Sequence, residues 1–130
     1  MTTTAPTATE SVARELVELC KAGRNMDAIS KLYSPDIVSI EPLDFEGMPA
    51  TMTGIDAIRK KNEWWFENYE TNSHQVDGPF VNGDQFAVKY LFDTTNKKTG
   101  ERFQMTEIAV YTVKEGKIVQ ERFFNQDRQG

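Results

Sequence analysis

The hydrophobic pattern of this chain changes period near residue 73, and that change limits the folds open to it. Before residue 73, apolar residues recur every three or four positions, as in amphipathic helices. After it, apolar and polar residues alternate, as in half-buried strands. Helices followed by a run of hairpins are typical of the α+β class. We expect three helices in the N-terminal half, packed on one face of a curved antiparallel or mixed sheet that encloses a pocket.

Local signals place the predicted helices. Residues 7–10 have capping-box spacing, which predicts a helix start there, and Gly23 is a natural stop. A second, short helix is predicted from Asn25 and ends before Pro35, because proline lacks the N–H that a continuing helix needs. A third helix is predicted to open at residues 53–56.

Strand and turn signals place the rest. Residues 37–41 form a β-branched run that predicts a strand, and residues 42–52 predict an irregular loop, parts of which fold over the core. Gly78-Pro79 is expected to interrupt a strand. Asn82-Gly83 and Glu115-Gly116 predict tight hairpin turns. Residues 1–8 are rich in Thr, Ala and Pro, and no linker divides the rest of the chain. We therefore expect a flexible tail over 1–8 and a single domain over 9–130.

The composition excludes several classes of protein. The 130 residues include 15 basic and 20 acidic side chains, a net charge of −5, which argues against nucleic-acid binding. The basic runs 59–61 and 97–98 are interpreted as solvated surface. No apolar run reaches the roughly 20 residues of a membrane span, and the N-terminus lacks the features of a signal peptide. We expect no membrane partner and a cytoplasmic location.

Cysteine and histidine are nearly absent. One cysteine, Cys20, permits no internal disulfide and no cysteine-cluster metal site, and one histidine permits no paired-histidine site. We expect no metal and no organic cofactor.

Glu107 is the most informative residue. Period-2 counting places it on the apolar, helix-facing side of a strand, where a carboxylate is costly unless it is paired, hydrogen-bonded or protonated. It is either a catalytic carboxyl group with a raised pKa, or a carboxylate that is simply bonded to a neighbour.

Two further residues are catalytic candidates. Glu41 ends a predicted strand beside an irregular loop, so it is either a general base at a pocket rim or a solvated carboxylate. His74 has the one side chain whose ordinary pKa lies near neutrality, and it is either catalytic or a satisfied structural residue.

Aromatic side chains crowd one helix and the strands. Most belong to the core, but Trp64 and Trp65 diverge by about 100°, so one is expected to face the sheet and the other a loop or partner. This abundance of aromatic side chains suits a pocket for a small hydrophobic molecule. The candidate ligand-binding residues are Trp65, Tyr90, Phe103, Tyr111 and Phe124.

The face opposite Glu107 also carries apolar residues, Ile108 and Val110. Antiparallel sheets commonly solvate one face, so this second apolar stripe predicts a covered outer face. The simplest cover is a second copy of the chain, which predicts a homodimer; the alternative is scattered surface apolar residues.

Three segments, taken in order, resemble the SnoaL-like proteins of the nuclear transport factor two/ketosteroid isomerase superfamily. They are residues 20–24, the strand–loop–helix of residues 37–42 and 53–58, and residues 111–119. The resemblance covers about residues 9–126. It implies a cone of curved sheet and three helices, commonly dimeric through the outer sheet face. Members include isomerases, polyketide cyclases, epoxide hydrolases, dehydratases and non-catalytic binding proteins, so it is poorly specific for activity.

The resemblance carries over few residues. Glu41-Pro42 matches the place of the proton-shuttling carboxylate of isomerase-like members. The oxyanion-binding tyrosine of the first helix would fall near Leu16, and the protonated acid of the late strand near Ala109, one inward position after Glu107. Steroid isomerase activity is therefore not expected.

Three functions remain open. The first is a cofactor-free isomerase, cyclase, dehydratase or epoxide hydrolase in which Glu41 or Glu107 moves the proton and His74 or Tyr111 polarises an oxygen. The second is a non-catalytic ligand-binding or accessory domain. The third is a purely dimeric structural module, which predicts a filled cone with no cavity.

Overall fold

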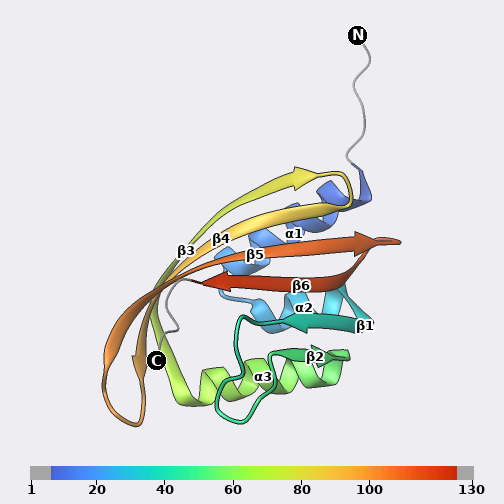
Figure 1. Ribbon diagram of the computed structural model, residues 1–130. Helices are drawn as coiled ribbons and strands as arrows, with labels where there is room; N and C mark the ends of the chain where they lie inside the picture. Colours follow the sequence, from blue (N-terminus) through green and yellow to red (C-terminus); the bar gives the residue numbers. More distant parts are fainter. Residues whose placement is uncertain (1–6, 126–130) are drawn as a thin grey trace.

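The computed structural model describes residues 7–125, in which three helices lie against one six-stranded sheet (Figure 1). Thr7 caps the first helix: its side chain accepts a hydrogen bond from the backbone N–H of Glu10, and Glu10 accepts one from that of Thr7, so the predicted capping box is confirmed. Thr7 and Ala8 therefore belong to this helix, while residues 1–6 of the predicted tail lie outside the described residues. The helices are α1 (Ala8–Lys21), α2 (Asn25–Leu32) and α3 (Ile55–Asn68).

The sheet has the order β2-β1-β6-β5-β4-β3. Neighbouring strands are antiparallel except β1 and β6, which run parallel, so the predicted mixed sheet is confirmed. The strands are β1 (Tyr33–Ile40), β2 (Thr51–Thr53), β3 (Tyr69–Asn82), β4 (Gln85–Asn96), β5 (Arg102–Lys114) and β6 (Lys117–Asn125).

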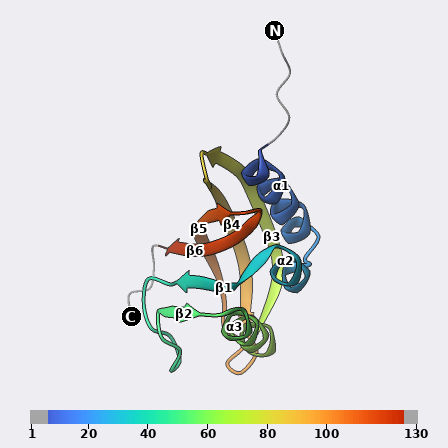
Figure 2. The same cartoon turned by 90° about the vertical axis from the view of Figure 1, so that its right-hand side faces the viewer.

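The sheet curves around one side of the molecule, and all three helices lie on its concave side (Figure 2). Alternate residues of β4 and β5 turn inward and are buried, among them Phe86, Val88 and Ala109. Leu16 and Val17 of α1 are buried with them in the same core. The α+β fold with helices on one face of a curved sheet is therefore confirmed.

Two local features differ from the sequence predictions. β1 begins at Tyr33 rather than residue 37, because a register shift between Tyr33 and Val38 accommodates Pro35. The short β2 lies at the end of the predicted loop and pairs with β1. The expected interruption of a strand at Gly78-Pro79 is confirmed: β3 has a register shift between Asp77 and Phe80 and continues beyond it.

One hairpin turn is displaced by a residue. β3 ends at Asn82 and β4 starts at Gln85, so Gly83 and Asp84 form the turn, and Gly83 has a φ of 64°. A positive φ at the first central position alone is typical of a type II′ turn, which favours glycine at that position. The other hairpin turn is as predicted: Glu115 and Gly116 have φ values of 51° and 74°.

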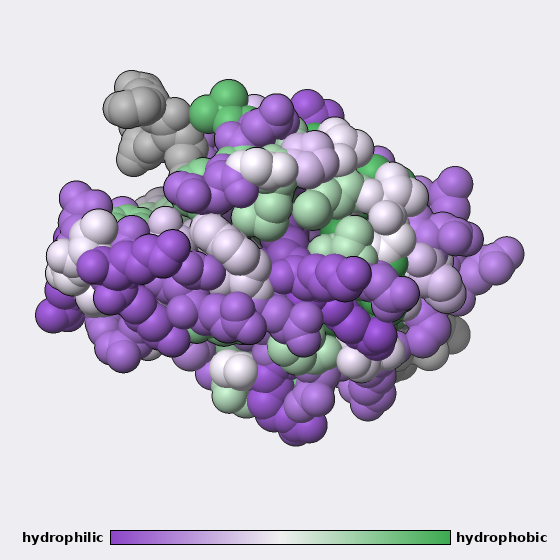
Figure 3. Space-filling view, turned by 90° about the horizontal axis from the view of Figure 1, so that it is seen from below, coloured by the Kyte–Doolittle hydropathy of each residue, from purple (hydrophilic) through white to green (hydrophobic). Residues whose placement is uncertain are grey.

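The lower face of the molecule is mainly hydrophilic, with apolar side chains between the polar ones (Figure 3). Among residues 7–125, no helix combines the length and hydrophobicity needed to cross a membrane.

Candidate functional site

A cavity of about 760 Å³ lies between the concave face of the sheet and the helices. This is within the size range of small-molecule sites. The inner faces of β4, β5 and β6 form one wall, and α1, α2 and α3 form the other. The loop after β1 also contributes, through residues 42–45 and 48–49, which confirms that parts of this loop fold over the interior.

Glu121 of β6 is buried at one end of the cavity and is fully hydrogen-bonded. The Tyr33 hydroxyl donates to one carboxylate oxygen, and the Ser39 hydroxyl donates to the other at 2.7 Å. Ser39 lies opposite Glu121 in the parallel β1–β6 register. Burial raises the pKa of Glu121, while Lys61 and the two hydroxyl donors counteract that rise.

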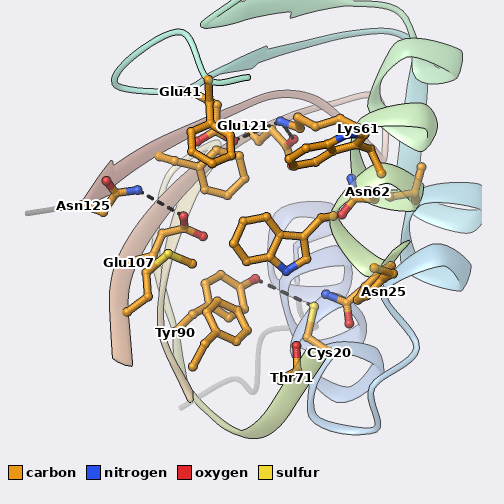
Figure 4. A pocket seen from close by; sticks show the side chains of 18 of the residues that line it. Cys20, Asn25, Glu41, Lys61, Asn62, Thr71, Tyr90, Glu107, Glu121 and Asn125 are labelled. Carbon is orange, nitrogen blue, oxygen red and sulfur yellow. Dashed lines mark hydrogen bonds and ion pairs between the residues drawn. The ribbon is translucent and has the colours of Figure 1, made fainter. Parts of the chain in front are cut away.

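Lys61 of α3 links two carboxylates. Its Nζ lies 3.1 Å from Glu41 and 3.8 Å from Glu121, and it donates to the Ser39 hydroxyl at 2.8 Å. The side chain is only 15% exposed, so the basic run at residues 59–61 is not uniformly solvated as predicted. Lys61 instead turns toward the cavity (Figure 4). Glu41, at the end of β1, therefore lines the cavity as half of an ion pair.

Glu107 of β5 also faces the cavity, as its position on the inward face predicted. Its carboxylate accepts a hydrogen bond from the Asn125 amide at 3.3 Å, and the two side chains point toward one another in Figure 4. Within the described residues it forms no ion pair. Burial, reinforced by the negative charge of Glu41, raises the pKa of Glu107 to about 7.

Two tyrosine hydroxyls lie deeper in the cavity wall. The hydroxyls of Tyr90 and Tyr111 are hydrogen-bonded at 2.7 Å, and the Cys20 sulfur lies 3.8 Å from that of Tyr90. Tyr90 is also directly opposite Glu107 in the β4–β5 register. Burial raises the pKa of both tyrosines well above the usual value and that of Cys20 to about 11, so all three groups are neutral donors near pH 7.

His74 contributes to the cavity lining from β3, but its ring is engaged. Its Nε2 lies 3.2 Å from the Lys21 carbonyl oxygen. A carbonyl oxygen only accepts, so Nε2 carries the proton in this contact. His74 thereby ties β3 to the end of α1, which is the structural role left open by the sequence.

The matching family model decides the classification. It describes a SnoaL-like domain and matches residues 7–125. The chain belongs to the SnoaL-like family. The resemblance recognised in three segments of the sequence is thus confirmed across the whole described structure.

Solved structures agree with this assignment. A protein from Mesorhizobium loti, named as a candidate SnoaL-like polyketide cyclase, is 46% identical, with a TM-score of 0.83, over 88% of this chain and 96% of that one. A candidate isomerase from Bacillus subtilis shares the fold at 17% identity and a TM-score of 0.73, over 92% and 86% of the two chains.

A third structure, from Catenulispora acidiphila, has a ketosteroid isomerase-like fold and was solved with trimethylamine. It is 16% identical, with a TM-score of 0.68, over 89% of this chain and 85% of that one, and such a likeness shows the fold alone. No curated protein matches the chain.

The aromatic residues of this SnoaL-like cavity are only partly those predicted. Trp65, Tyr90 and Tyr111 line it, whereas Phe103 and Phe124 do not. Phe124 is 48% exposed on the outer face, because the inward positions of β6 are the alternate ones, including Phe123. Phe103 is partly buried and packs edge-on against Tyr69, with ring centroids 6.1 Å apart.

The two adjacent tryptophans diverge, as expected. Trp64 packs against Phe45 of the covering loop at 5.9 Å, and Trp65 stacks on Tyr69 at 4.2 Å. Both contribute to the cavity lining. The loop and α3 therefore close one side of the cavity through aromatic contacts.

Several polar residues of the site were missed from the sequence, among them Tyr33, Lys61, Glu121 and Asn125. Glu121 and Asn125 alternate with Phe123 on β6, so the period-2 argument used for Glu107 would also have placed them inward. Lys61 gave no such signal, because it belongs to a run of three basic residues. Tyr33 was assigned to the end of a helix, whereas it starts β1. Within residues 7–125, no group of three metal-ligating side chains comes together.

Proposed function

We propose that this SnoaL-like protein is a cofactor-independent enzyme that moves a proton on a small hydrophobic molecule, with Glu107 as the acid–base group. The observation that carries the proposal is the placement of Glu107 in an apolar cavity with a pKa of about 7. A group with such a pKa is present in both protonation states near neutrality, which is the optimum for general acid–base catalysis.

The surrounding groups support distinct roles. Glu41 is fixed by Lys61 at 3.1 Å, so the two carboxylates have different environments, as acid–base pairs in enzymes do. The neutral Tyr90 hydroxyl lies opposite Glu107 and is a candidate donor to a substrate oxygen. A proton taken by Glu107 from a carbon beside a carbonyl, with that carbonyl bonded to Tyr90, is chemistry that an isomerase or a cyclase requires.

The first test measures Glu107 directly. Carboxyl ¹³C NMR across a pH series is expected to give Glu107 a midpoint near its pKa of about 7. The assignment comes from Glu107→Gln, in which that resonance disappears. A midpoint at the ordinary carboxyl value of about 4.3 would refute the proposed role.

The second test measures proton transfer. Deuterium uptake from D₂O into a panel of cyclic and aryl ketones is followed by ¹H NMR. Glu107→Gln is expected to lower the rate about 100-fold or more, whereas the exposed helical variant Glu63→Gln is expected to match the parent. If the ketones quench the tryptophans of the cavity but exchange no faster than in buffer, the protein is the binding domain that the sequence left open.

We further propose a homodimer through the outer sheet face. Ile108 and Phe124 lie side by side on that face, paired across β5 and β6, and are 44% and 48% exposed. Adjacent exposed apolar side chains of this kind mark association surfaces, and the family resemblance implies the same face.

A further inference from the structure

The charges that face the cavity are unbalanced. Carboxylates come from four residues, Glu41, Asp44, Glu107 and Glu121, whereas lysine or arginine comes from Lys61 alone among the described lining residues. Lys61 is already engaged by Glu41, Glu121 and the Ser39 hydroxyl. A ligand carboxylate or phosphate would therefore find no free cation there and would meet several negative charges.

The end of the cavity around Glu107 lacks positive charge. Glu41 and Glu121 both act on Glu107 by charge repulsion, and Lys61 offsets only part of this. Beside it, the Asn125 Oδ1 is buried and accepts no hydrogen bond from the described residues. The Asn125 amide donates to Glu107 through its other atom, Nδ2. The negative charge of the Glu107 carboxylate can be neutralised by a proton on Glu107 or by a cationic N–H group of a ligand.

The walls near Glu107 suit a cation with a hydrocarbon body. Tyr90 is directly opposite Glu107, and Phe92, Phe123 and Trp65 also line the cavity. Aromatic faces attract cations, more strongly where water is excluded. The protein already uses this arrangement, because the Lys61 ammonium lies 5.2 Å from the centre of the Phe123 ring.

We propose that the cavity takes a hydrophobic amine, with its ammonium group beside the Glu107 carboxylate and its apolar part against the aromatic walls. The proposal names a ligand class for the cavity of the proposed function, and it rests on that function only for the position of Glu107. Binding exchanges one positive charge for another: the ammonium binds, and the proton of Glu107 leaves to the buffer.

The tyrosine hydroxyls and the cysteine thiol that face the cavity do not supply this proton. From β1, β4 and β5, the hydroxyls of Tyr33, Tyr90 and Tyr111 stay protonated, because burial raises the pKa of each well above the usual value. From α1, the Cys20 thiol stays protonated for the same reason. His74 of β3, whose Nε2 donates to the Lys21 carbonyl, and the carboxyl groups of Glu41, Asp44 and Glu121 also face the cavity. The Glu107→Gln variant separates their contribution from that of Glu107.

The test uses three probes of one shape. N,N-dimethylbenzylamine is a cation at neutral pH, isobutylbenzene is its neutral carbon isostere, and phenylacetate is an anion of similar size. Quenching of the cavity tryptophans gives the affinities. The amine is expected to bind about tenfold tighter than either of the other probes near pH 7, a difference of about 1.4 kcal/mol.

Proton release identifies the group. Calorimetry of the amine in phosphate and in Bis-Tris, which both buffer between pH 6 and pH 7 and differ in protonation enthalpy, is expected to show about half a proton released near pH 7 and nearly one near pH 6. Glu107→Gln is expected to lose both the release and the preference for the amine while it still binds isobutylbenzene. Glu63→Gln, on the exposed side of α3, is expected to retain both.

Equal affinity for the amine and isobutylbenzene, or amine binding without proton release, would overturn the inference. If Glu107→Gln fails to fold, the Glu107 carboxyl ¹³C resonance of the parent protein replaces it, assigned there by through-bond correlation with the Glu107 side-chain and backbone resonances. Amine near pH 6 should move that resonance to its ionised position, and no movement refutes the proposal. If the amine binds but the protein catalyses no exchange of the ketones, the proposed proton transfer is refuted and the ligand class is not. If the ketones exchange but the amine is not preferred, the ligand class is refuted and the proton transfer is not.

Discussion

Glu41, just after β1, and Glu107 of β5 face one cavity, and within residues 7–125 only Glu41 of the two has a cationic partner. Lys61 lies 3.1 Å from Glu41, whereas Glu107 is held by the neutral amide of Asn125 at 3.3 Å. Two carboxyl groups of the same residue type are thereby given different chemical properties by their neighbours.

The first prediction concerns the pH dependence of stability. The folded-state pKa of Glu107 is raised from 4.5 to about 7, so the folded protein binds more protons than the unfolded chain between these values. Its contribution to the free energy of unfolding therefore falls as the pH rises through this window, by at most about 3 kcal/mol. Urea unfolding of Glu107→Gln at about pH 5 and about pH 8 should show a smaller fall than the parent. An unchanged fall would contradict the assignment.

The second prediction concerns Lys61. Lys61→Met removes the cation beside the buried Glu121 carboxylate, so the free energy of unfolding should drop by about 3 kcal/mol near pH 8. The drop should be smaller near pH 5, because Glu121 without its cation is more readily protonated. Lys60→Met is the matched control, since the adjacent lysine is exposed and should change stability by less than about 0.5 kcal/mol. A similar loss in both variants would show that the ion pair is not the cause.

The third prediction compares two tyrosine hydroxyls. Tyr33→Phe removes a donor to the Glu121 carboxylate and should cost about 2 kcal/mol, because bonds to charged groups are the stronger class. Tyr90→Phe removes only a bond between neutral groups and should cost about 1 kcal/mol. Chemical denaturation at neutral and acid pH gives the free energy of unfolding of each variant. The loss for Tyr33→Phe should become smaller in acid, where Glu121 is protonated, and the loss for Tyr90→Phe should not change.

The fourth prediction concerns association. Glu replacements at Ile108 and Phe124 place like charges on the adjacent apolar positions of the outer face. Light scattering with size-exclusion chromatography should give twice the chain mass for the parent and the single chain mass for this double variant. Leu43→Glu, at a loop residue that is 53% exposed, should keep the parent's mass. A monomeric parent would refute the proposed dimer.

The sequence allowed the fold to be predicted because its signals are local. The capping box at Thr7, the turn at Gly116 and the alternation along β5 each depend on a few neighbouring residues. The turn was predicted at Asn82-Gly83 but lies at Gly83-Asp84, because Gly83 can occupy either central position of a two-residue turn.

The site could be predicted only in part, because its residues meet through tertiary contacts. Glu107 was identified from its strand face, and its raised pKa follows from burial. The network of Tyr33, Ser39, Lys61 and Glu121 combines residues from β1, α3 and β6, and no local pattern connects them. Phe124 was misassigned because two adjacent phenylalanines compete for one inward position on β6.

The parallel pairing of β1 with β6 has a consequence for biosynthesis. The bond from Ser39 to Glu121 joins positions 82 residues apart, so this end of the cavity does not exist until the last strand has left the ribosome. Contacts so distant in sequence form late, after the local helices and hairpins. A chain that has not yet added β6 lacks this wall of the binding site, so a ligand of the cavity can stabilise only a chain that includes β6.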